Sequence, residues 1–406
     1  MLAATRSVLS RAARAPVRAA STVARAAAAA SGSESFGSSA WARGLMFGAV
    51  AAAAAGSVAA CEAEEESPEL ASMAIFSGNA NPDLAALIAE HVGKPLGSAT
   101  VGRFPDGEVS VSVHENVRGK DIYIIQPTCP PHVNEYLVEL LLMVTTMRRA
   151  SAEKITVVVP YYGYARQDRK MTSRVPISAA DIARLLESVG VDRVVALDLH
   201  CGQIQGFFGP RVPVDNLAAA RVGVSYFARK VDLENPVIVS PDAGGVYRAK
   251  VFREGLNLQT GSDAGLAMIV KQRPRAGVVG QMDLVGEVTG CDCIIVDDMI
   301  DTAGTLCKAA DLLRAKGARR VYCFASHGLF SGPAVQRISK SCLEKVVVVN
   351  TIPLASNAKT CDKIEQLSVA PILGDAIKRI HMRKSVSAMF SGKKVVAAAS
   401  PAAERA

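Results

Sequence analysis

Aromatic side chains are scarce in this sequence, and its positive charges do not form long blocks. Of the 406 residues, 5% are Phe, Trp or Tyr, and a single residue is Trp. Proteins that bind nucleic acids usually combine a basic stripe with aromatic side chains that stack on bases. The chain has neither pattern, so we expect no nucleic-acid partner. Its 46 Lys and Arg residues exceed the 38 Asp and Glu residues by eight, which suits small anionic substrates.

Regularly spaced cysteine pairs are also missing. The nine cysteines are odd in number and scattered, and none forms a C-x-x-C pair; Cys291 and Cys293 are separated by one residue. A zinc or redox motif needs defined spacing, and a disulfide framework needs paired cysteines. We therefore expect reduced, structural thiols.

Acidic residues are missing from the start of the chain, where the first is Glu34. Five arginines are instead spread through Ala and Ser, namely Arg6, Arg11, Arg14, Arg18 and Arg25. This composition is typical of a transit peptide and predicts a mitochondrial leader, with a plastid leader or a disordered Ala-rich tail as alternatives. Residues 44–60 form an uncharged, Ala-dominated run at the lower edge of the roughly 17–25 residues that span a bilayer. They are either a cleaved targeting element or an anchor, and a membrane partner is expected only if they are retained.

Strand and helix patterns alternate from residue 73 onward. Residues 155–159 and 194–199 are β-branched runs typical of buried strands, and residues 135–149 have the apolar spacing of an amphipathic helix. This alternation predicts an α/β fold of mostly parallel sheets flanked by helices, with ligands at the carboxyl ends of the strands. We expect a leader at 1–71, two domains at 72–216 and 217–390, and an Ala-rich tail at 391–406.

The most informative segment follows the strand predicted at residues 293–296. Asp297 and Asp298 come first, and a small, hydroxyl-rich loop then leads to a helix predicted at 306–316; the loop consists of Asp301, Thr302, Ala303, Gly304 and Thr305. Backbone N–H groups and threonines at a helix N-terminus can surround a phosphate. The two carboxylates can accept hydrogen bonds from ribose hydroxyls or hold Mg²⁺. For such a segment taken alone, a well-capped helix with two solvated acids is the alternative.

Two other predicted strands also end in acids. Asp198 and His200 fall at the end of the strand predicted at 194–199, where two residues that are two apart point to the same side and could hold a metal ion. Asp242 precedes a glycine turn after the strand predicted at 237–240, a place suited to phosphates with Mg²⁺. A lone histidine is more often structural, which is the alternative for His200.

Three loops carry further candidate residues. Residues 103–108 form a turn with one aromatic and two acidic side chains, and residues 160–170 are dense in Tyr, Arg and Gln, which can stack on a purine and bind its phosphates. The segment that starts at Lys271 is basic and lacks hydrophobic periodicity, which predicts a flexible loop that closes over a charged substrate. Each loop taken alone has a simpler alternative. Residues 103–108 could be a plain turn, residues 160–170 a solvated basic loop, and the segment from Lys271 a surface hairpin.

Over residues 76–390 the sequence resembles the ribose-phosphate pyrophosphokinase family, also called phosphoribosyl diphosphate synthetases. The resemblance lies in separate strings, at residues 115–119, 163–170, 198–200, 203–208 and 240–245, and in the loop after Asp298. It implies two phosphoribosyltransferase-like domains in a homo-oligomer built from dimers, with a hexamer expected. The implied reaction transfers the diphosphoryl group of ATP, with Mg²⁺, to O1 of ribose 5-phosphate. Its products are 5-phospho-α-D-ribose 1-diphosphate and AMP, which serve nucleotide biosynthesis.

The resemblance also implies a role for individual residues. ATP would be bound by Phe104, Asp106 and Glu108, supplied across a subunit interface, and by Arg166 and Gln167. Ribose 5-phosphate would be bound by Asp297, Asp298, Asp301, Thr302, Ala303, Gly304 and Thr305. Lys271 and Arg273 would be catalytic cations, and His200 and Asp242 a magnesium-linked pair. Arg118, Ser385 and Ser387 would form a regulatory site for phosphate or ADP.

Two positions depart from the family pattern, and two other functions compete with the kinase. Gln272 stands where many members have a basic residue, and Pro105 stands where Ser is common. We expect these two departures to alter closure of the catalytic loop and the affinity for ATP. A phosphoribosyltransferase would share the loop after Asp298 but would not need the ATP residues. A non-catalytic associated subunit would keep the fold and act by assembly, and the retention of Lys271 and Arg273 argues against it.

Overall fold

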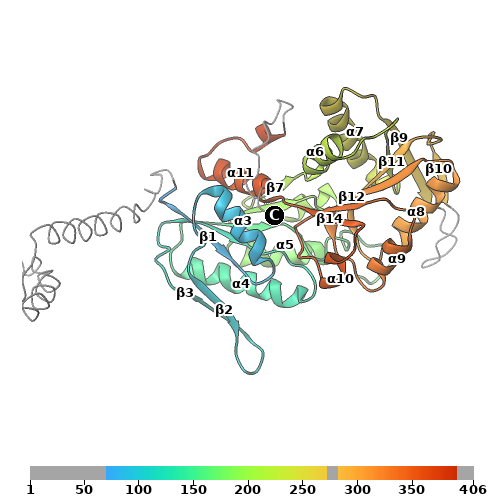
Figure 1. Ribbon diagram of the computed structural model, residues 1–406. Coiled ribbons are helices and arrows are strands. Elements are labelled where there is room, and N and C mark those ends of the chain that lie inside the picture. The colour runs from blue at the N-terminus through green and yellow to red at the C-terminus, as the bar shows by residue number, and fades with distance from the viewer. Residues whose placement is uncertain (1–69, 272–281, 391–406) are drawn as a thin grey trace, which may run out of the picture. The chain divides into compact units, whose positions relative to one another are not determined.

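The computed structural model describes residues 70–271 and 282–390, except for the side chain of Lys271. These residues contain two larger sheets and a separate two-stranded hairpin (Figure 1). Residues 1–69 of the predicted leader, which include the apolar run at 44–60, lie outside the described residues, as do Gln272, Arg273 and the tail. Among the residues that are described, no helix is long and apolar enough to cross a membrane.

The first sheet has five parallel strands in the order β1-β4-β5-β6-β7. Their bounds are β1 Met73–Ser77, β4 Asp121–Ile125, β5 Lys154–Val159, β6 Arg193–Leu197 and β7 Val214–Leu217. The strands are apolar on both faces because helices cover both sides of a parallel sheet. Ile75 and Tyr123 pack toward α3 (Pro82–Val92), whereas Phe76 and Ile124 pack toward α4 (Val133–Arg149) and α5 (Ser178–Ser188).

The second sheet has seven strands in the order β10-β9-β8-β11-β12-β13-β14, and only β10 at its edge is antiparallel. The strands are β8 Val237–Ser240, β9 Gly265–Lys271, β10 Met282–Val285, β11 Asp292–Ile300, β12 Arg320–Gly328, β13 Val346–Val349 and β14 Ile364–Leu367. The helices of this half are α6 Ala220–Lys230, α7 Val246–Thr260, α8 Gly304–Ala315, α9 Ala334–Lys340, α10 Ser356–Lys359 and α11 Ala370–His381. The predicted α/β fold of mostly parallel sheets flanked by helices is confirmed.

The last helix returns to the first sheet and packs against α3. His91 Nε2 lies 2.9 Å from Asp375 Oδ1, and Lys378 Nζ donates to the carbonyl of His91 at 2.7 Å. Segments that are almost 300 residues apart in the sequence therefore share one buried core. The predicted domain division at residues 216 and 217 falls at the end of β7 and stays a prediction.

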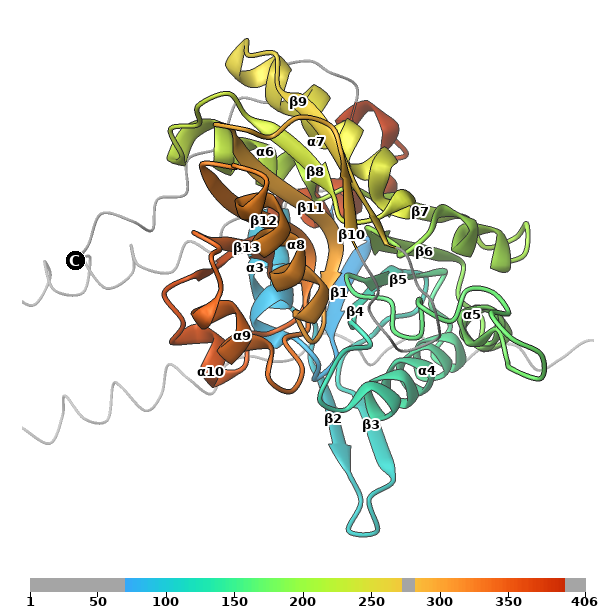
Figure 2. The ribbon, with the colours of Figure 1, turned by 90° about the vertical axis from the view of Figure 1, so that its right-hand side faces the viewer.

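A two-stranded antiparallel hairpin extends beyond the α4 side of the first sheet (Figure 2). It pairs β2 (Ala99–Arg103) with β3 (Val109–Val113), and Gly107 at its tip has φ 95°, a conformation that favours glycine. The half-exposed strand predicted at 109–113 is confirmed. The turn residues Phe104, Asp106 and Glu108 therefore lie at the end of a projecting arm.

Candidate active site

The two acids expected to bind the sugar lie near the carboxyl end of β11, between β8 and β12. Asp298 is buried, and its Oδ2 lies 2.7 Å from Nδ1 of His200, which follows β6 in the first sheet. Arg248 of α7 places a guanidinium nitrogen 3.6 Å from the other oxygen of Asp298. The site is thus formed where the carboxyl ends of strands from both sheets meet.

These contacts fix the charge of the cluster. Burial alone would raise the pKa of Asp298, but the hydrogen bond from His200 and the charge of Arg248 outweigh it and hold that pKa well below its usual range. The same hydrogen bond raises the pKa of His200 above its ordinary value. Burial and the neighbouring Asp298 raise the pKa of Asp297. The contact therefore favours the ionised form of Asp298 and the protonated form of His200.

The loop after β11 has the backbone expected of a phosphate site. Ala303 has φ 56°, a left-handed conformation that costs a non-glycine residue roughly 1–2 kcal/mol, and α8 begins directly after it at Gly304. Arg337 of α9 supports the loop by donating to the carbonyl of Thr302 at 2.8 Å. Thr305 lies in the first turn of α8, where backbone N–H groups have no partner within the helix. The loop predicted for ribose 5-phosphate is therefore placed at a helix N-terminus.

Arg166 reaches this loop from the first sheet. Its guanidinium lies 2.6 Å from Oδ2 of Asp301, the first residue of the loop. Burial would raise the pKa of Asp301, but hydrogen bonds from Ser331 and Arg166 outweigh it and lower that pKa. Gln167, beside Arg166, accepts a hydrogen bond from Ser178 at 2.6 Å. A residue predicted for ATP therefore contacts a residue predicted for the sugar phosphate.

The prediction that Asp198 and His200 share a strand is wrong. Strand β6 ends at Leu197, and Asp198 has φ 42°, so strand alternation does not orient these two side chains. Asp198 instead accepts hydrogen bonds from the backbone of Ala219 at 2.9 Å and from Ser326 Oγ at 2.5 Å. Its side chain thus ties the end of β6 to β12 of the second sheet.

Sequence reasoning missed the residues behind Asp198. His327 is buried; its Nε2 lies 3.2 Å from the carbonyl of Asp198, and its Nδ1 lies 2.9 Å from Thr351 Oγ1. Burial lowers the pKa of His327, so this ring is a neutral structural bridge. The available signal was the pair Ser326 and His327 at the end of a buried apolar strand.

Asp242 follows β8 and begins the next helical segment. Its Oδ1 accepts a hydrogen bond from the backbone of Gly245 at 3.1 Å, which makes Asp242 an N-cap. Within the described residues, no three His, Cys, Asp or Glu side chains are arranged to hold a metal ion. Mg²⁺ in nucleotide sites is commonly held by one or two carboxylates together with substrate phosphates and water. The acids present therefore fit an ion that arrives with a nucleotide.

The remaining predicted residues lie on other elements. Phe104 is 54% exposed at the tip of the hairpin, where the backbone of Glu108 donates to Asp106 Oδ1 at 3.1 Å. Lys271 is the last residue of β9. Their assignment to the ATP site and to catalysis stays a prediction.

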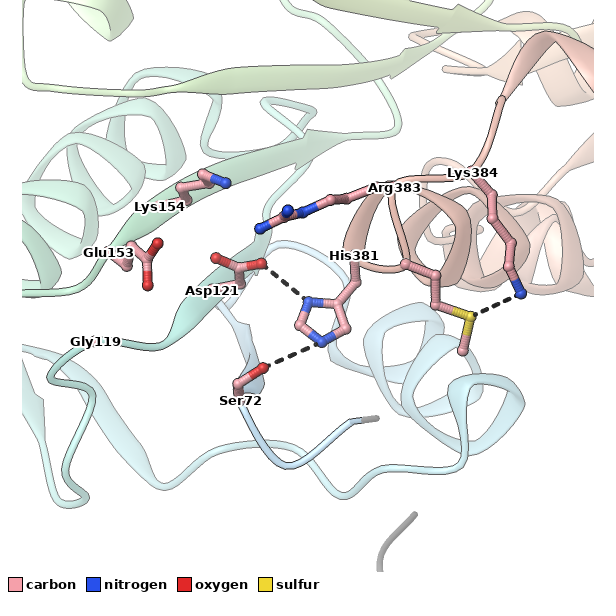
Figure 3. Close-up of a pocket in the computed structure, with 9 residues that line it drawn as sticks. Ser72, Gly119, Asp121, Glu153, Lys154, His381, Arg383 and Lys384 are labelled. Carbon is pink, nitrogen blue, oxygen red and sulfur yellow. Dashed lines mark hydrogen bonds and ion pairs between the residues drawn. The ribbon is translucent and has the colours of Figure 1, made fainter. Parts of the chain in front are cut away.

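The residues predicted for regulation flank a cavity at the opposite, amino-terminal edge of the first sheet. Arg118 donates to Ser151 Oγ at 3.2 Å, and the carbonyl of Ser385 accepts from Arg379 at 3.1 Å. The cavity has a volume of about 400 Å³ and is lined by Ser72, Gly119, Asp121, Glu153, Lys154, His381, Met382, Arg383 and Lys384. Figure 3 shows Lys154 and Arg383 reaching into this space, whereas Lys384 turns toward Met382. Ser387 begins the short helix Ser387–Met389 beyond it.

Two mostly parallel sheets with acids and a small, hydroxyl-rich loop at their carboxyl ends are the architecture of phosphoribosyltransferase-like α/β proteins. Residues 73–190 match the N-terminal domain of ribose phosphate pyrophosphokinase, and residues 262–391 match the phosphoribosyl synthetase-associated domain. The ribose-phosphate pyrophosphokinase of Pasteurella multocida is 52% identical over 318 residues, which cover 78% of this chain and 98% of the relative. The chain belongs to the ribose-phosphate pyrophosphokinase family.

Other relatives agree with this placement. The ribose-phosphate pyrophosphokinase of Shewanella oneidensis is 51% identical over 318 residues, covering 78% of this chain and 98% of its own. The crystal structure of phosphoribosylpyrophosphate synthetase from Mycobacterium smegmatis superposes with a TM-score of 0.70 at 38% identity, covering 77% of this chain and 99% of that chain. The predictions of an enzyme of this family and of its fold are confirmed.

Proposed function

We propose that this chain transfers the diphosphoryl group of ATP to O1 of ribose 5-phosphate, with 5-phospho-α-D-ribose 1-diphosphate and AMP as products. The observation that carries the proposal is the pair of contacts that His200 and Arg166 make with Asp298 and Asp301. Arg166 is expected to bind ATP and His200 to belong to the magnesium-linked pair, whereas Asp298 and Asp301 are expected to bind the sugar phosphate, and these contacts support a shared site. A phosphoribosyltransferase would have no need of that arrangement.

Ribose 5-phosphate binds with its phosphate at the N-terminus of α8. The backbone N–H groups of residues 302–305 and the hydroxyls of Thr302 and Thr305 surround the phosphate, and the helix dipole favours its charge. Asp297 and Asp298 accept hydrogen bonds from the ribose hydroxyls, which fixes the sugar with O1 toward the nucleotide.

ATP binds between this loop and the segment after β5. Arg166 leaves Asp301 for the polyphosphate, because a guanidinium forms paired hydrogen bonds with phosphate oxygens. Mg²⁺ would be held by Asp242 and the phosphates, with His200 beside it, and supplies charge neutralisation on the diphosphoryl oxygens.

The transfer is an in-line displacement. O1 of the sugar gives up its proton to water and bonds to the β-phosphorus as the bond from the β-phosphorus to the AMP oxygen breaks, and AMP leaves with that electron pair. Lys271 and Arg273 stabilise the charge that develops on the transferred group, one as a point charge and the other as a fork. Gln272, which stands between them in the sequence, replaces neither cation.

The hairpin completes the nucleotide site of another copy of the chain. Phe104, Asp106 and Glu108 lie between β2 and β3. The hairpin of these two strands projects from the sheet (Figure 2), which suits delivery of the turn to a neighbouring subunit. Val138 and Leu142 are exposed one turn apart on α4 and suit burial in an oligomer. The assembly is a homo-oligomer built from dimers, with a hexamer as the expected form.

The cavity beside Arg118 suits regulation by phosphate or ADP. Lys154 and Arg383 bring positive charge into it, and Ser385 and Ser387 supply hydroxyls nearby (Figure 3). The leader composition suits import into a mitochondrion, with a plastid as the alternative. A fusion of residues 1–71 to a fluorescent protein tests this, and a cytosolic signal would reject it.

AMP release from ATP by the full chain, with and without ribose 5-phosphate, tests the proposal. AMP that forms only with the sugar supports the kinase. A folded chain that forms no sugar-dependent AMP would instead be an associated subunit, and would be assayed next for its effect on an active relative.

A further inference from the structure

A buried carboxylate at the base of the hairpin makes hydrogen bonds both to the core of the first sheet and to the hairpin itself. Glu139 of α4 is fully buried, and its two oxygens accept four hydrogen bonds. A buried anion is tolerated only when donors replace the lost water, and all of its oxygens here have them. Some of these donors belong to the first sheet and one belongs to the hairpin, so the carboxylate connects the two.

Two partners fix Glu139 to the first sheet. Gln126, which follows β4, donates to Oε2 of Glu139 at 2.7 Å. Asn79, in the loop after β1, donates from its backbone to Oε2 at 3.2 Å and from its side chain to Oε1 at 3.1 Å. The carboxylate is therefore held in one position by residues of the rigid sheet.

The third partner, which makes the fourth hydrogen bond, is Arg103, the last residue of β2 and the neighbour of Phe104. Its guanidinium donates to Glu139 Oε1 at 2.8 Å and to Glu135 Oε2, one helical turn earlier, at 3.0 Å. The Asn79 side chain adds a second tie by donating to the carbonyl of Val101 in β2 at 3.0 Å. The hairpin is thus anchored at its base through Glu139 and Asn79.

The tip cannot orient itself without this anchor. An isolated two-stranded hairpin is marginally stable in water, so its direction depends on what holds its base. The tip is ordered internally, because Phe104 donates to the carbonyl of Glu108 at 2.8 Å and Gly107 to that of Phe104 at 2.9 Å. An ordered tip on a fixed base moves as one piece with Arg103.

We propose that Glu139 is a positioning residue for the nucleotide: through Arg103 it aims the Phe104 to Glu108 turn at the adenine nucleotide of the site that this turn completes. The inference rests on the proposed ATP role of the hairpin. Loosening the base weakens ATP binding, because small displacements of positioning groups are costly, and leaves the distant sugar-phosphate loop intact.

Steady-state kinetics of Glu139→Gln, an isosteric change, test the proposal. We expect the KM for ATP to rise about tenfold or more and the KM for ribose 5-phosphate to stay within about twofold. Hydrogen exchange of residues 102–109 should become faster. The matched control is Glu135→Gln, which removes the exposed partner of Arg103 and should leave the KM for ATP within about twofold, because exposed ion pairs contribute little.

A second pair of variants covers the case in which Glu139→Gln does not fold. Arg103→Met keeps the bonds of Glu139 to Asn79 and Gln126 and should raise the KM for ATP in the same way, while Arg103→Lys should restore part of the loss. An unchanged KM for ATP and unchanged exchange in Glu139→Gln, or in Arg103→Met if the first variant does not fold, would overturn the positioning role. If the wild-type protein forms no sugar-dependent AMP, the proposed function is contradicted instead. In that case hydrogen exchange still tests the anchor, and unchanged exchange of the hairpin in the variants would overturn the anchoring itself.

Discussion

His200 Nδ1 lies 2.7 Å from Asp298 Oδ2, although 98 residues separate the two in the sequence. The contact joins the loop after the fourth strand of the first sheet to the central strand of the second. It also fixes the orientation of the imidazole, because Nδ1 is committed to the carboxylate and Nε2 remains for a ligand. The candidate active site is thus organised by a hydrogen-bonded pair between the two sheets.

Replacing Asp298 by Asn should lower the pKa of His200. The carboxylate favours the protonated ring, so its loss removes the cause of the raised pKa and the ring should titrate at a lower pH. NMR titration of the histidine ring signals in magnesium-free protein measures this. Asp375→Asn, which removes the partner of His91, is the matched control and should not move His200. An unchanged His200 titration in Asp298→Asn would show that the pair is absent in solution.

Lys271→Ala and Arg273→Ala should each lower kcat by about 10²–10³-fold, the usual cost of losing one donor to a transition state. Binding of ribose 5-phosphate should change little, because the sugar-phosphate loop lies after β11. Arg275→Ala, in the same basic stretch, is the control and should keep most of the activity. Wild-type kcat in both Lys271→Ala and Arg273→Ala would remove these residues from the mechanism.

Thr305→Val should raise the KM for ribose 5-phosphate by about tenfold or more. The change keeps the side-chain shape but removes one hydroxyl, and hydrogen bonds to charged groups contribute about 1.5–3 kcal/mol. The KM for ATP should change far less. The exposed Thr289, at the opposite edge of the sheet, offers Thr289→Val as a control. Equal sugar KM values in Thr305→Val and wild type would place the phosphate elsewhere.

Mixing two inactive variants should restore activity if the hairpin serves a neighbouring subunit. Phe104→Ala impairs the arm but keeps the cations, whereas Lys271→Ala impairs the catalytic loop but keeps the arm. Hybrid oligomers, formed by dissociation and reassembly, should contain sites with an intact arm and an intact loop. Recovery of AMP formation above the sum of the separate variants is expected. No recovery in verified hybrids would mean that each arm serves its own chain.

Asp292→Asn should destabilise the fold by about 3–5 kcal/mol at neutral pH without affecting substrate binding. Asp292 is fully buried at the start of β11, far along the strand from the site, and is paired with Arg319 and Arg320 at 2.5 and 2.7 Å. Burial would raise its pKa, but hydrogen bonds from the two arginines lower it.

Because that pKa is lowered on folding, the stabilisation is present above the unfolded value of about 3.9 and is lost as pH falls through the folded value. Denaturant unfolding at several pH values measures the difference between Asp292→Asn and wild type. The difference should shrink under acid conditions. If the difference in free energy of unfolding stays constant down to the most acidic pH measured, the stabilisation does not come from the ionised Asp292 carboxylate.

Strongly patterned elements could be predicted closely from the sequence. The strand predicted at 155–159 is β5, Lys154–Val159, and the helix predicted at 135–149 is α4, Val133–Arg149. The apolar spacing of these segments depends only on local periodicity. By contrast, Pro213, Asp215 and Asn216 are turn formers and locally favour a turn where β7 lies, and the pairing of β7 with β6 overrides that preference.

The loops of the site could be found from residue type, but their contacts could not. The string from Asp297 to Thr305 marks a phosphate loop by its small and hydroxylated residues alone. The bond from Ser326 to Asp198 joins residues 128 apart and stabilises a backbone conformation that no local pattern indicates. Contacts of this kind depend on how the two sheets meet, which one sequence does not encode locally.

The most direct test of the central claim is phosphorus NMR of a reaction that contains the full chain, ATP, ribose 5-phosphate and Mg²⁺. The account predicts that AMP appears together with a pentose that carries one phosphate at C5 and a diphosphate at C1. Formation of ADP with a pentose bisphosphate would mean that a single phosphoryl group is transferred. That result would contradict diphosphoryl transfer and the in-line attack on the β-phosphorus.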